Sequence, residues 1–155
     1  MKLSIVAIGR LVRAPEAELV KTYAERATAA GRALALGPLT VIEVESRKPG
    51  KAAEAQALAQ HLTDAHVIAC DEHGRAKPSR AFAEEIAGLR DAGVRRLAFV
   101  IGGADGLAPQ LLAQANGVLA LGPQTWPHAL ARAMLAEQLY RAVTILAGSP
   151  YHRDG

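Results

Sequence analysis

The sequence has a single cysteine, Cys70, and lacks any long hydrophobic run. One cysteine excludes an intrachain disulfide and a cysteine-based zinc cage within one chain, and it favours a reducing compartment. No segment approaches the roughly 18 consecutive apolar residues of a membrane helix, and residues 1–9 lack the pattern of a secretory signal. We therefore expect a cytoplasmic protein with no membrane partner.

Aromatic residues are also scarce, at 4% of the chain, although 50% of its residues are hydrophobic and 21% are charged. A chain of this composition buries a core of Leu, Val, Ile and Ala, so wholesale disorder is excluded. Its 155 residues predict one domain over residues 1–155. The formal net charge of +3 allows a polyanionic partner but does not require one.

Short β-branched runs alternate with helical patterns along the whole chain. This alternation predicts an α/β fold, with a mostly parallel sheet covered by helices on both faces. In such sheets ligands bind beyond the carboxyl ends of the strands, so the segments starting at Asp71, Gly102 and Gly122 are the candidate site. The expected strands span residues 2–9, 39–44, 66–70, 96–101 and 117–121, and the expected helices span 14–31, 52–62, 107–114 and 128–147, with another beginning after Ser79.

Two local predictions follow from this assignment. Residues 71–78 are polar and form a loop, and Ser79 is the N-cap of the helix that carries Phe82, Ile86 and Leu89 on one face. In the last helix, apolar spacing predicts an inward face, which consists of Leu130, Met134, Gln138 or Leu139, Ala142 and Leu146.

A glycine-rich run, residues 102–106, follows one expected strand and precedes a helix. Glycines allow a sharp turn and let a ligand approach the backbone N–H groups, with an anion-favouring helix N-terminus beyond. The run is neither a dinucleotide fingerprint nor a P-loop. An ordinary strand-to-helix turn is the alternative.

The C-terminal third carries the other candidate residues. His128 stands at the mouth of the last helix, where a capping role is the alternative. The tail places Tyr151, His152 and Arg153 in succession: a stacking ring, a group that titrates near neutrality and a phosphate-binding fork. The alternative for these three residues is a disordered tail. The alternative for Arg141, the remaining candidate, is a surface ion pair with Glu137. Since the tail follows Pro150, we expect it to be extended and to add little to the core.

The remaining histidines, His61, His66 and His73, have no metal-ligand spacing, and no nucleophile elbow is present. We therefore expect no metal. Two basic loops, at residues 47–51 and 75–80, could contact a nucleic-acid backbone, although a solvated surface is the commoner meaning of such clusters.

Several motifs together resemble one family. The strand that ends at Gly9, the run Ile101–Leu107 and the sequences TWPH, EQLYRA and PYHR at residues 125–128, 137–142 and 150–153 are similar to the bacterial ribosomal RNA large subunit methyltransferase H family, in the SPOUT superfamily. The similarity covers most of the chain.

This resemblance implies properties that composition does not reveal. The C-terminal third would thread a deep trefoil knot, an exception to the rule against threaded chains. The protein would be a homodimer that binds S-adenosylmethionine (SAM) within the knot. It would methylate N3 of a pseudouridine in a hairpin of 23S rRNA, acting on the assembled ribosome.

The resemblance also implies site residues. The family's cofactor contacts fall on Cys70, Gly102, Leu121, Gly122, Pro123, Gln124, Thr125 and Trp126. Its substrate-handling and catalytic positions fall on Arg141, Tyr151, His152 and Arg153, with His152 as a reasonable general base. The family usually has Leu where Cys70 and Trp126 stand and Ser-rich sequence at residues 122–124, which leaves the shape of the adenine pocket open.

Two other functions remain. A SPOUT-like methyltransferase could act on another RNA such as tRNA, but this chain has no appended RNA-binding domain. A noncatalytic ribosome-binding factor could keep the fold, and detectable SAM binding would separate it from an enzyme.

Overall fold

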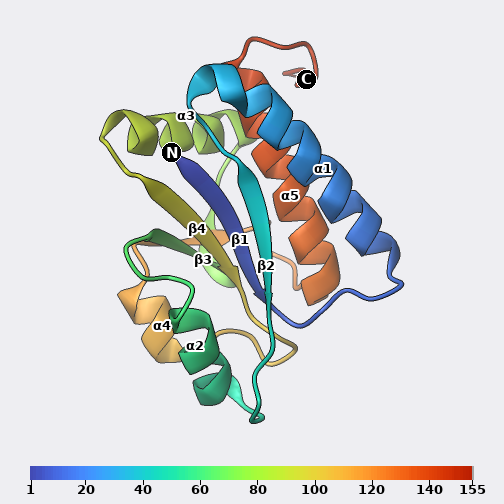
Figure 1. Ribbon diagram of the computed structural model, residues 1–155, viewed down its shortest axis with the longest axis vertical. Helices are drawn as coiled ribbons and strands as arrows, with labels where there is room; N and C mark the ends of the chain where they lie inside the picture. Colours follow the sequence, from blue (N-terminus) through green and yellow to red (C-terminus); the bar gives the residue numbers. More distant parts are fainter. Residues whose placement is uncertain (155) are drawn as a thin grey trace.

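A five-stranded sheet forms the centre of the computed structural model, which describes residues 1–154 (Figure 1). Its strands lie in the order β2-β1-β4-β3-β5, and every neighbouring pair is parallel. The strands are β1 (Lys2–Ile8), β2 (Leu39–Val44), β3 (His66–Ala76), β4 (Arg96–Ile101) and β5 (Gly117–Ala120). The predicted parallel sheet is confirmed.

Helices cover both faces of this sheet, as predicted, with α1, α3 and α5 on one face and α2 and α4 on the other (Figure 1). Their ends differ from the expected ends by up to three residues. The helices are α1 (Pro15–Gly31), α2 (Lys51–Ala59), α3 (Ser79–Asp91), α4 (Pro109–Gln114) and α5 (His128–Leu146), with a 3-10 turn, η1 (Arg32–Leu34), after α1. Within residues 1–154, none of them is long and apolar enough to span a membrane.

The core is divided by the sheet into two clusters, because successive side chains of a strand point to opposite faces. In β1, Leu3 and Ile5 join the cluster under α1, α3 and α5, whereas Val6 and Ile8 join the one under α2 and α4. Burying a side chain of this size contributes about 1.5–3 kcal/mol. The alternation therefore fixes both layers and the place of the loops between them.

The expected loop at residues 71–78 is wrong for most of its length. β3 continues to Ala76, and its second half pairs with β5 through Arg75 and Ala76 after a register shift that follows Cys70. Polar residues mark this extension because it lies at the surface, while backbone pairing with β5 stabilises it.

One prediction about the helices is wrong and another is correct only in part. Pro78 is the N-cap of α3, and the Ser79 hydroxyl instead donates a 2.7 Å hydrogen bond to Oε1 of Gln138 on α5. The predicted inward face of α5 is confirmed at Leu139 and Ala142, which are fully buried, whereas Leu130 is exposed and Met134 is half-buried. The buried residues of α5 are Arg132, Ala133, Leu135, Ala136, Leu139, Ala142, Val143 and Thr144. The helix turns this face to α1 and α3.

Candidate functional site

A cavity of about 860 Å³ lies beyond the carboxyl ends of β4 and β5; we call it cavity A. Its walls come from the segments 70–73 and 101–107, from residues 119 and 121 and from the segment 124–128, with Lys51 from the start of α2. These include the starts of two predicted ligand-binding segments, Asp71 and Gly102. A cavity of this volume is typical of sites that hold small molecules and cofactors.

Most of the predicted cofactor residues line cavity A. The structure brings Cys70, Gly102, Leu121, Gln124, Thr125 and Trp126 to its wall. Gly122 lines a neighbouring cavity instead, and Pro123 is exposed and belongs to neither wall in the described chain. His128 lines cavity A as the first residue of α5.

The glycine run forms a tight turn in which Gly106 N–H donates a 3.0 Å hydrogen bond to the Gly103 carbonyl. A Cβ added at Gly102 would lie 2.7 Å from the carbonyl carbon and oxygen of Gly106. A Cβ at Gly103 would lie 3.0 Å from a carboxylate oxygen of Glu54 on α2. The chain's own packing therefore already requires glycine at 102, whatever the ligand does.

The wall of cavity A carries more negative than positive charge. Asp71, Glu72 and Asp105 line it against one cation, Lys51, within the described residues. Asp71 accepts a 2.9 Å hydrogen bond from the His73 N–H, and Glu72 accepts one from the Thr125 hydroxyl. This excess of carboxylates favours a ligand of net positive charge.

Two side chains of the wall are fixed by their surroundings. The Trp126 indole N–H donates a 3.0 Å hydrogen bond to the Leu121 carbonyl, which holds the turn between β5 and α5. Burial raises the pKa of the Cys70 thiol to about 12, and the neighbouring Asp71 carboxylate adds to the shift. Cys70 therefore stays protonated and apolar at neutral pH.

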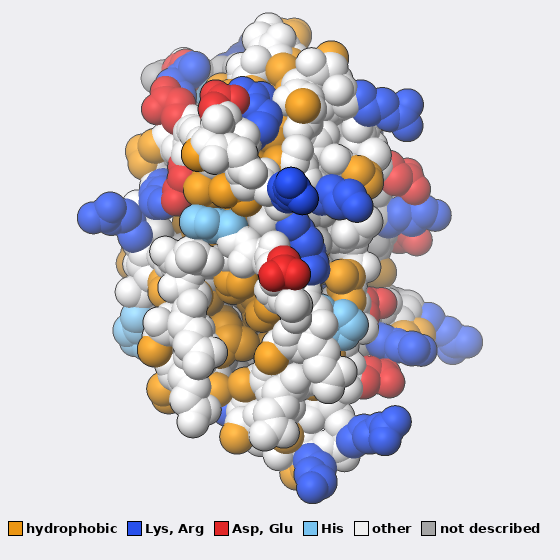
Figure 2. Space-filling model, turned by 60° about the vertical axis from the view of Figure 1, so that its left-hand side comes forward, with side chains coloured by type: hydrophobic (Ala, Val, Ile, Leu, Met, Phe, Trp, Pro, Cys, Tyr) orange, Lys and Arg blue, Asp and Glu red, His pale blue; other side chains and the backbone are white. Residues whose placement is uncertain are grey.

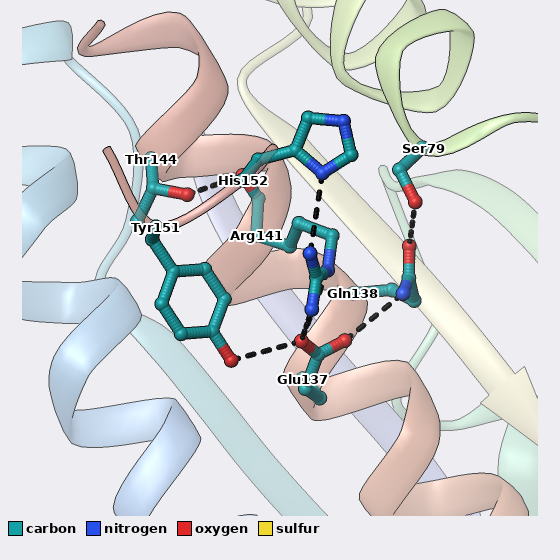
Figure 3. A network of polar contacts seen from close by, with 7 residues as sticks. All are labelled: Ser79, Glu137, Gln138, Arg141, Thr144, Tyr151 and His152. Atoms are coloured by element: carbon teal, nitrogen blue, oxygen red, sulfur yellow. Dashed lines mark hydrogen bonds and ion pairs between the residues drawn. The ribbon is translucent and has the colours of Figure 1, made fainter. Parts of the chain in front are cut away.

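A second group of polar side chains surrounds Glu137 on α5 (Figure 3). Its Oε1 accepts hydrogen bonds from Arg141 Nε at 3.0 Å and Nη2 at 2.6 Å, and from the Tyr151 hydroxyl at 3.0 Å. Its Oε2 accepts a 2.9 Å hydrogen bond from Gln138 Nε2. The pair of Glu137 with Arg141 was weighed as a surface pair, but both side chains are largely buried at 18% and 26% exposure.

The C-terminal tail folds back onto this group. The Tyr151 ring lies 4.7 Å from the Tyr140 ring, centroid to centroid, and the Arg141 guanidinium stands 4.9 Å from its centre. Burial and the Glu137 carboxylate raise the pKa of the Tyr151 phenol. The tail is thus packed and ordered, contrary to both the disordered and the freely extended alternatives, while Arg153 is exposed.

The two ring nitrogens of His152 have different partners. Arg141 Nη1 lies 3.2 Å from Nδ1 of His152, and since a guanidinium only donates, Nδ1 must be the acceptor. Nε2 then carries the proton and donates to Asp154 Oδ1 at 3.0 Å. Hydrogen bonds from Arg80 and then His152 lower the pKa of Asp154.

The tail and cavity A do not meet within one chain. Arg141, Tyr151, His152 and Arg153 lie outside the wall of cavity A as described for residues 1–154, and the C-terminus lies at the opposite end of α5 from His128 (Figure 1). Between them is a cavity of about 500 Å³, cavity B, whose wall includes Ser79, Gln138 and Glu137. Cavities A and B share Leu119 and Leu121.

Figure 2 shows a face of the molecule with a hollow whose floor is hydrophobic. Lys and Arg side chains lie at several places around this hollow. Within residues 1–154, no three His, Cys, Asp or Glu side chains are grouped so that they could hold a metal ion.

Local sequence patterns do not predict the long-range polar partners of three side chains. Ser79 is expected as a cap and Gln138 as part of a helix face, and no partner is expected for Arg132. Their partners lie 59 and 89 residues away in the chain, so spacing gave no signal. Only the run 137–142, quoted for the resemblance, pointed to this part of α5.

A family model described as "Predicted SPOUT methyltransferase" matches residues 1–152. Among curated proteins, the chain is 80% identical over 154 residues to the ribosomal RNA large subunit methyltransferase H of Phenylobacterium zucineum, covering 99% of this chain and 100% of that one. It is 54% identical over 155 residues to the protein of the same name from Dinoroseobacter shibae, covering 99% of both chains.

Solved structures share the fold at low sequence identity. A probable methylase family protein from Haemophilus influenzae superimposes with a TM-score of 0.54 at 16% identity, covering 98% of this chain and 70% of that one. A probable methyltransferase from Bordetella pertussis gives 0.54 at 14% identity, covering 92% and 96%.

Proposed function

We propose a reaction for this chain on the premise that it belongs to the SPOUT methyltransferases and, within them, to the ribosomal RNA large subunit methyltransferase H family. Membership in this superfamily implies the C-terminal trefoil knot. The reaction is methylation of N3 of a pseudouridine in 23S rRNA of the large ribosomal subunit. The observation that carries the proposal is the full-length identity to relatives named for large-subunit rRNA, which favours this substrate over tRNA.

The methyl donor in this proposal is SAM, and the residues of cavity A fit it. SAM carries a sulfonium and an ammonium against one carboxylate, so the carboxylates of Asp71, Glu72 and Asp105 suit its net positive charge. The volume of about 860 Å³ is sufficient for a nucleoside with an amino-acid arm. When bound, SAM supplies an electrophilic methyl group on sulfur.

Within this site, Gly102, Leu121 and Thr125 would hold the cofactor at the carboxyl ends of β4 and β5. Most of the acceleration would come from alignment, because a displacement at the methyl carbon needs the acceptor nitrogen in line with the bond that breaks. The sulfur of bound SAM would keep the electron pair of the broken bond, and the N3 proton of the base would have to be removed by a group of the protein. No metal is needed for any of these steps.

His152 is the proposed general base for that proton, with Nδ1 as the accepting atom. Since Nδ1 accepts a hydrogen bond from Arg141 in the free chain, this bond must open before the base can act. The freed guanidinium, or the exposed one of Arg153, would then stabilise the anionic base or hold an RNA phosphate. Tyr151 would position the tail through its bond to Glu137.

We propose that the enzyme is a homodimer. The tail with the proposed base lies outside cavity A of its own chain, so a second chain is needed to bring the base and the cofactor together. A partner chain would bring its tail to that cavity or complete the RNA surface beside it. Exposed apolar side chains support a twofold contact: Val12 is 70% exposed, Leu19 45% and Leu130 39%. The protein would act in the cytoplasm, on the assembled ribosome.

Mass mapping of rRNA tests the function. Large subunits from a strain without this protein should lack one methyl group on one pseudouridine, and the purified protein with SAM should restore it. The proposal predicts greater activity on assembled ribosomes than on free 23S rRNA. Unchanged rRNA in that strain would contradict the function.

Substitution of His152 tests the base. His152→Ala should slow methylation by about 10²–10⁴-fold at neutral pH, and the loss should shrink at high pH, where the imide of the base ionises unaided. His61→Ala, a histidine outside both cavities, is the matched control. A wild-type rate for His152→Ala at neutral pH would remove the base assignment.

A further inference from the structure

Cavity B is a second cavity, whose wall meets that of cavity A. It is bounded by the start of α3, the end of β5 and the middle of α5, with Leu119 and Leu121 shared with cavity A. A ligand in cavity B therefore lies one side-chain layer from a cofactor in cavity A. On its other side stands Glu137, which holds the tail.

The wall of cavity B has the chemistry of a nucleobase pocket. Phe82, Leu119, Leu121 and Met134 supply apolar surface, and the polar groups of Ser79 and Gln138 meet at one side. A flipped base needs apolar faces for its ring and a polar edge that reads its hydrogen-bonding groups. A volume of about 500 Å³ holds one nucleotide.

The orientation of the Gln138 amide is fixed by its partners. Glu137 can only accept, so the NH₂ group of Gln138 must face it, and the carboxylate is held in turn by Arg141 and Tyr151. Oε1 of Gln138 accepts from the Ser79 hydroxyl. One N–H and one lone pair of the amide are not used by these partners and remain as a donor and an acceptor for a ligand.

Pseudouridine offers the matching pair. It is joined to ribose through C5, so its N1 carries a proton and lies beside the C2 carbonyl, whereas N1 of uridine is bonded to the sugar. An amide that accepts from N1–H and donates to O2 leaves N3 free. Uridine cannot make the first of these bonds, and a buried acceptor without a partner is costly.

We propose that cavity B binds the acceptor base and that Gln138, oriented by Ser79 and Glu137, selects pseudouridine over uridine by reading N1–H and O2. This inference rests on the proposed methylation of pseudouridine. Glu137 is then a positioning residue for two groups at once, since the same carboxylate holds the amide that reads the base and the tail that carries His152.

The first test uses two matched substrates: large subunits with pseudouridine at the acceptor position and subunits with uridine there, from a strain that lacks the corresponding pseudouridine synthase. The wild-type chain should prefer pseudouridine by at least tenfold in kcat/KM. Gln138→Leu should bring that ratio to within about threefold of unity, mainly by losing activity on pseudouridine. Ser79→Ala, which frees the amide to turn, should lower the ratio less.

SAM affinity separates this role from a structural one. Trp126 is the only tryptophan and lines cavity A, so its fluorescence reports SAM binding. Gln138→Leu should leave that affinity unchanged, and Gln114→Leu, an exposed glutamine outside both cavities, should leave the ratio unchanged. A Gln138→Leu enzyme that keeps the wild-type preference, or loses activity equally on both substrates, overturns the proposal.

A second measurement needs no turnover. The sequence has two methionines, Met1 and Met134, and Met134 lines cavity B. With methyl-¹³C methionine, the Met134 signal should shift on addition of pseudouridine nucleoside and shift at least fivefold less with uridine. If the Met134 signal shifts equally with both nucleosides, or with neither, cavity B is not the pocket of the acceptor nucleobase, even if the wild-type chain methylates ribosomes. Conversely, a selective shift without methylation would leave cavity B assigned and remove only the proposed function.

Discussion

Nη1 of Arg132 on α5 donates a 2.8 Å hydrogen bond to Oε2 of Glu43 on β2, 89 residues earlier in the chain. The Arg132 side chain is only 1% exposed, and its Nη2 also donates to the carbonyl oxygens of Ile8 and Gly9 at 3.0 Å. One guanidinium therefore ties the first turns of α5 to the carboxyl ends of β1 and β2.

Loss of this buried cation should weaken the whole fold. Arg132→Met removes the donor to two carbonyls and the cation beside Glu43, which keeps only the Leu11 N–H as a donor to Oε2. Breaking a fully buried pair typically costs about 3–5 kcal/mol, and because Glu43 is 35% exposed the cost here should lie at the lower end of that range. Urea unfolding measures the cost. Arg10→Met is the control, because the pair of Arg10 with Glu45 is about two-thirds exposed and should contribute less than about 1 kcal/mol. Equal effects of the two substitutions would contradict this account.

A side chain at residue 102 should clash with the backbone of the glycine turn itself, whether or not a ligand is bound. Gly102→Ala places a Cβ against the Gly106 backbone, so the turn must shift. We expect SAM affinity, read from Trp126 fluorescence, to fall at least tenfold, or about 1.4 kcal/mol. Gly117→Ala is the control, since a Cβ there has nothing within 4 Å. Wild-type affinity in Gly102→Ala would remove this turn from the cofactor site.

Removal of residues 151–155 should lower stability as well as activity. The Tyr151 ring packs on Tyr140 and its hydroxyl donates to the charged Glu137, and such a hydrogen bond contributes about 1.5–3 kcal/mol. The truncated chain should melt several degrees below the full chain, and methylation of ribosomes should fall by orders of magnitude. Tyr151→Phe should lose the hydrogen bond alone. An unchanged melting temperature after truncation would show that the packed tail is not stabilising.

The Cys70 thiol should react slowly and should make the fold sensitive to alkali. With a folded pKa of about 12, the thiolate fraction at pH 8 is about 10⁻⁴, so disulfide reagents should modify Cys70 far more slowly than free cysteine. The unfolded chain, with a pKa of 9.0, loses its proton first as pH rises. Stability from this group is therefore complete below pH 9 and declines by about 1.4 kcal/mol per pH unit from there toward pH 12.

Cys70→Ala should abolish that part of the decline, which urea unfolding at pH 8 to 11 measures. Bound SAM should slow thiol modification further if Cys70 borders the cofactor. Rapid labelling of the folded chain at pH 8 would be inconsistent with a half-buried thiol that stays protonated.

The proposed dimer should depend on exposed leucine. Light scattering should find twice 16.3 kDa at micromolar concentration. Leu19→Arg, on the outer side of α1, should shift the chain to a monomer because it places a charge in an apolar contact. Ala81→Arg, an exposed position on α3, should not. A wild-type monomer would exclude the dimer, and a dimeric Leu19→Arg would move the interface elsewhere.

The sequence by itself determined the layers of this fold. Continuous apolar strands alternating with helical patterns are sufficient to predict a parallel sheet covered on both faces, because each strand must bury two sides. It also located two of the segments that line cavity A, those that start at Asp71 and Gly102, although Asp71 lies within β3 and only Gly102 follows a strand. The family motifs added the class of reaction, which composition and charge left open.

Only the tertiary structure decided which polar residues act together. β5 lies beside β3 and stabilises a polar extension that sequence reasoning assigned to a loop. Ser79 meets Gln138 because α3 and α5 pack on the same face, so the hydroxyl bonds a side chain 59 residues away and does not cap its own helix. Hydrophobic periodicity reports which residues are apolar, but the partners of a buried charge or amide depend on packing between elements, and sequence spacing carries no record of that.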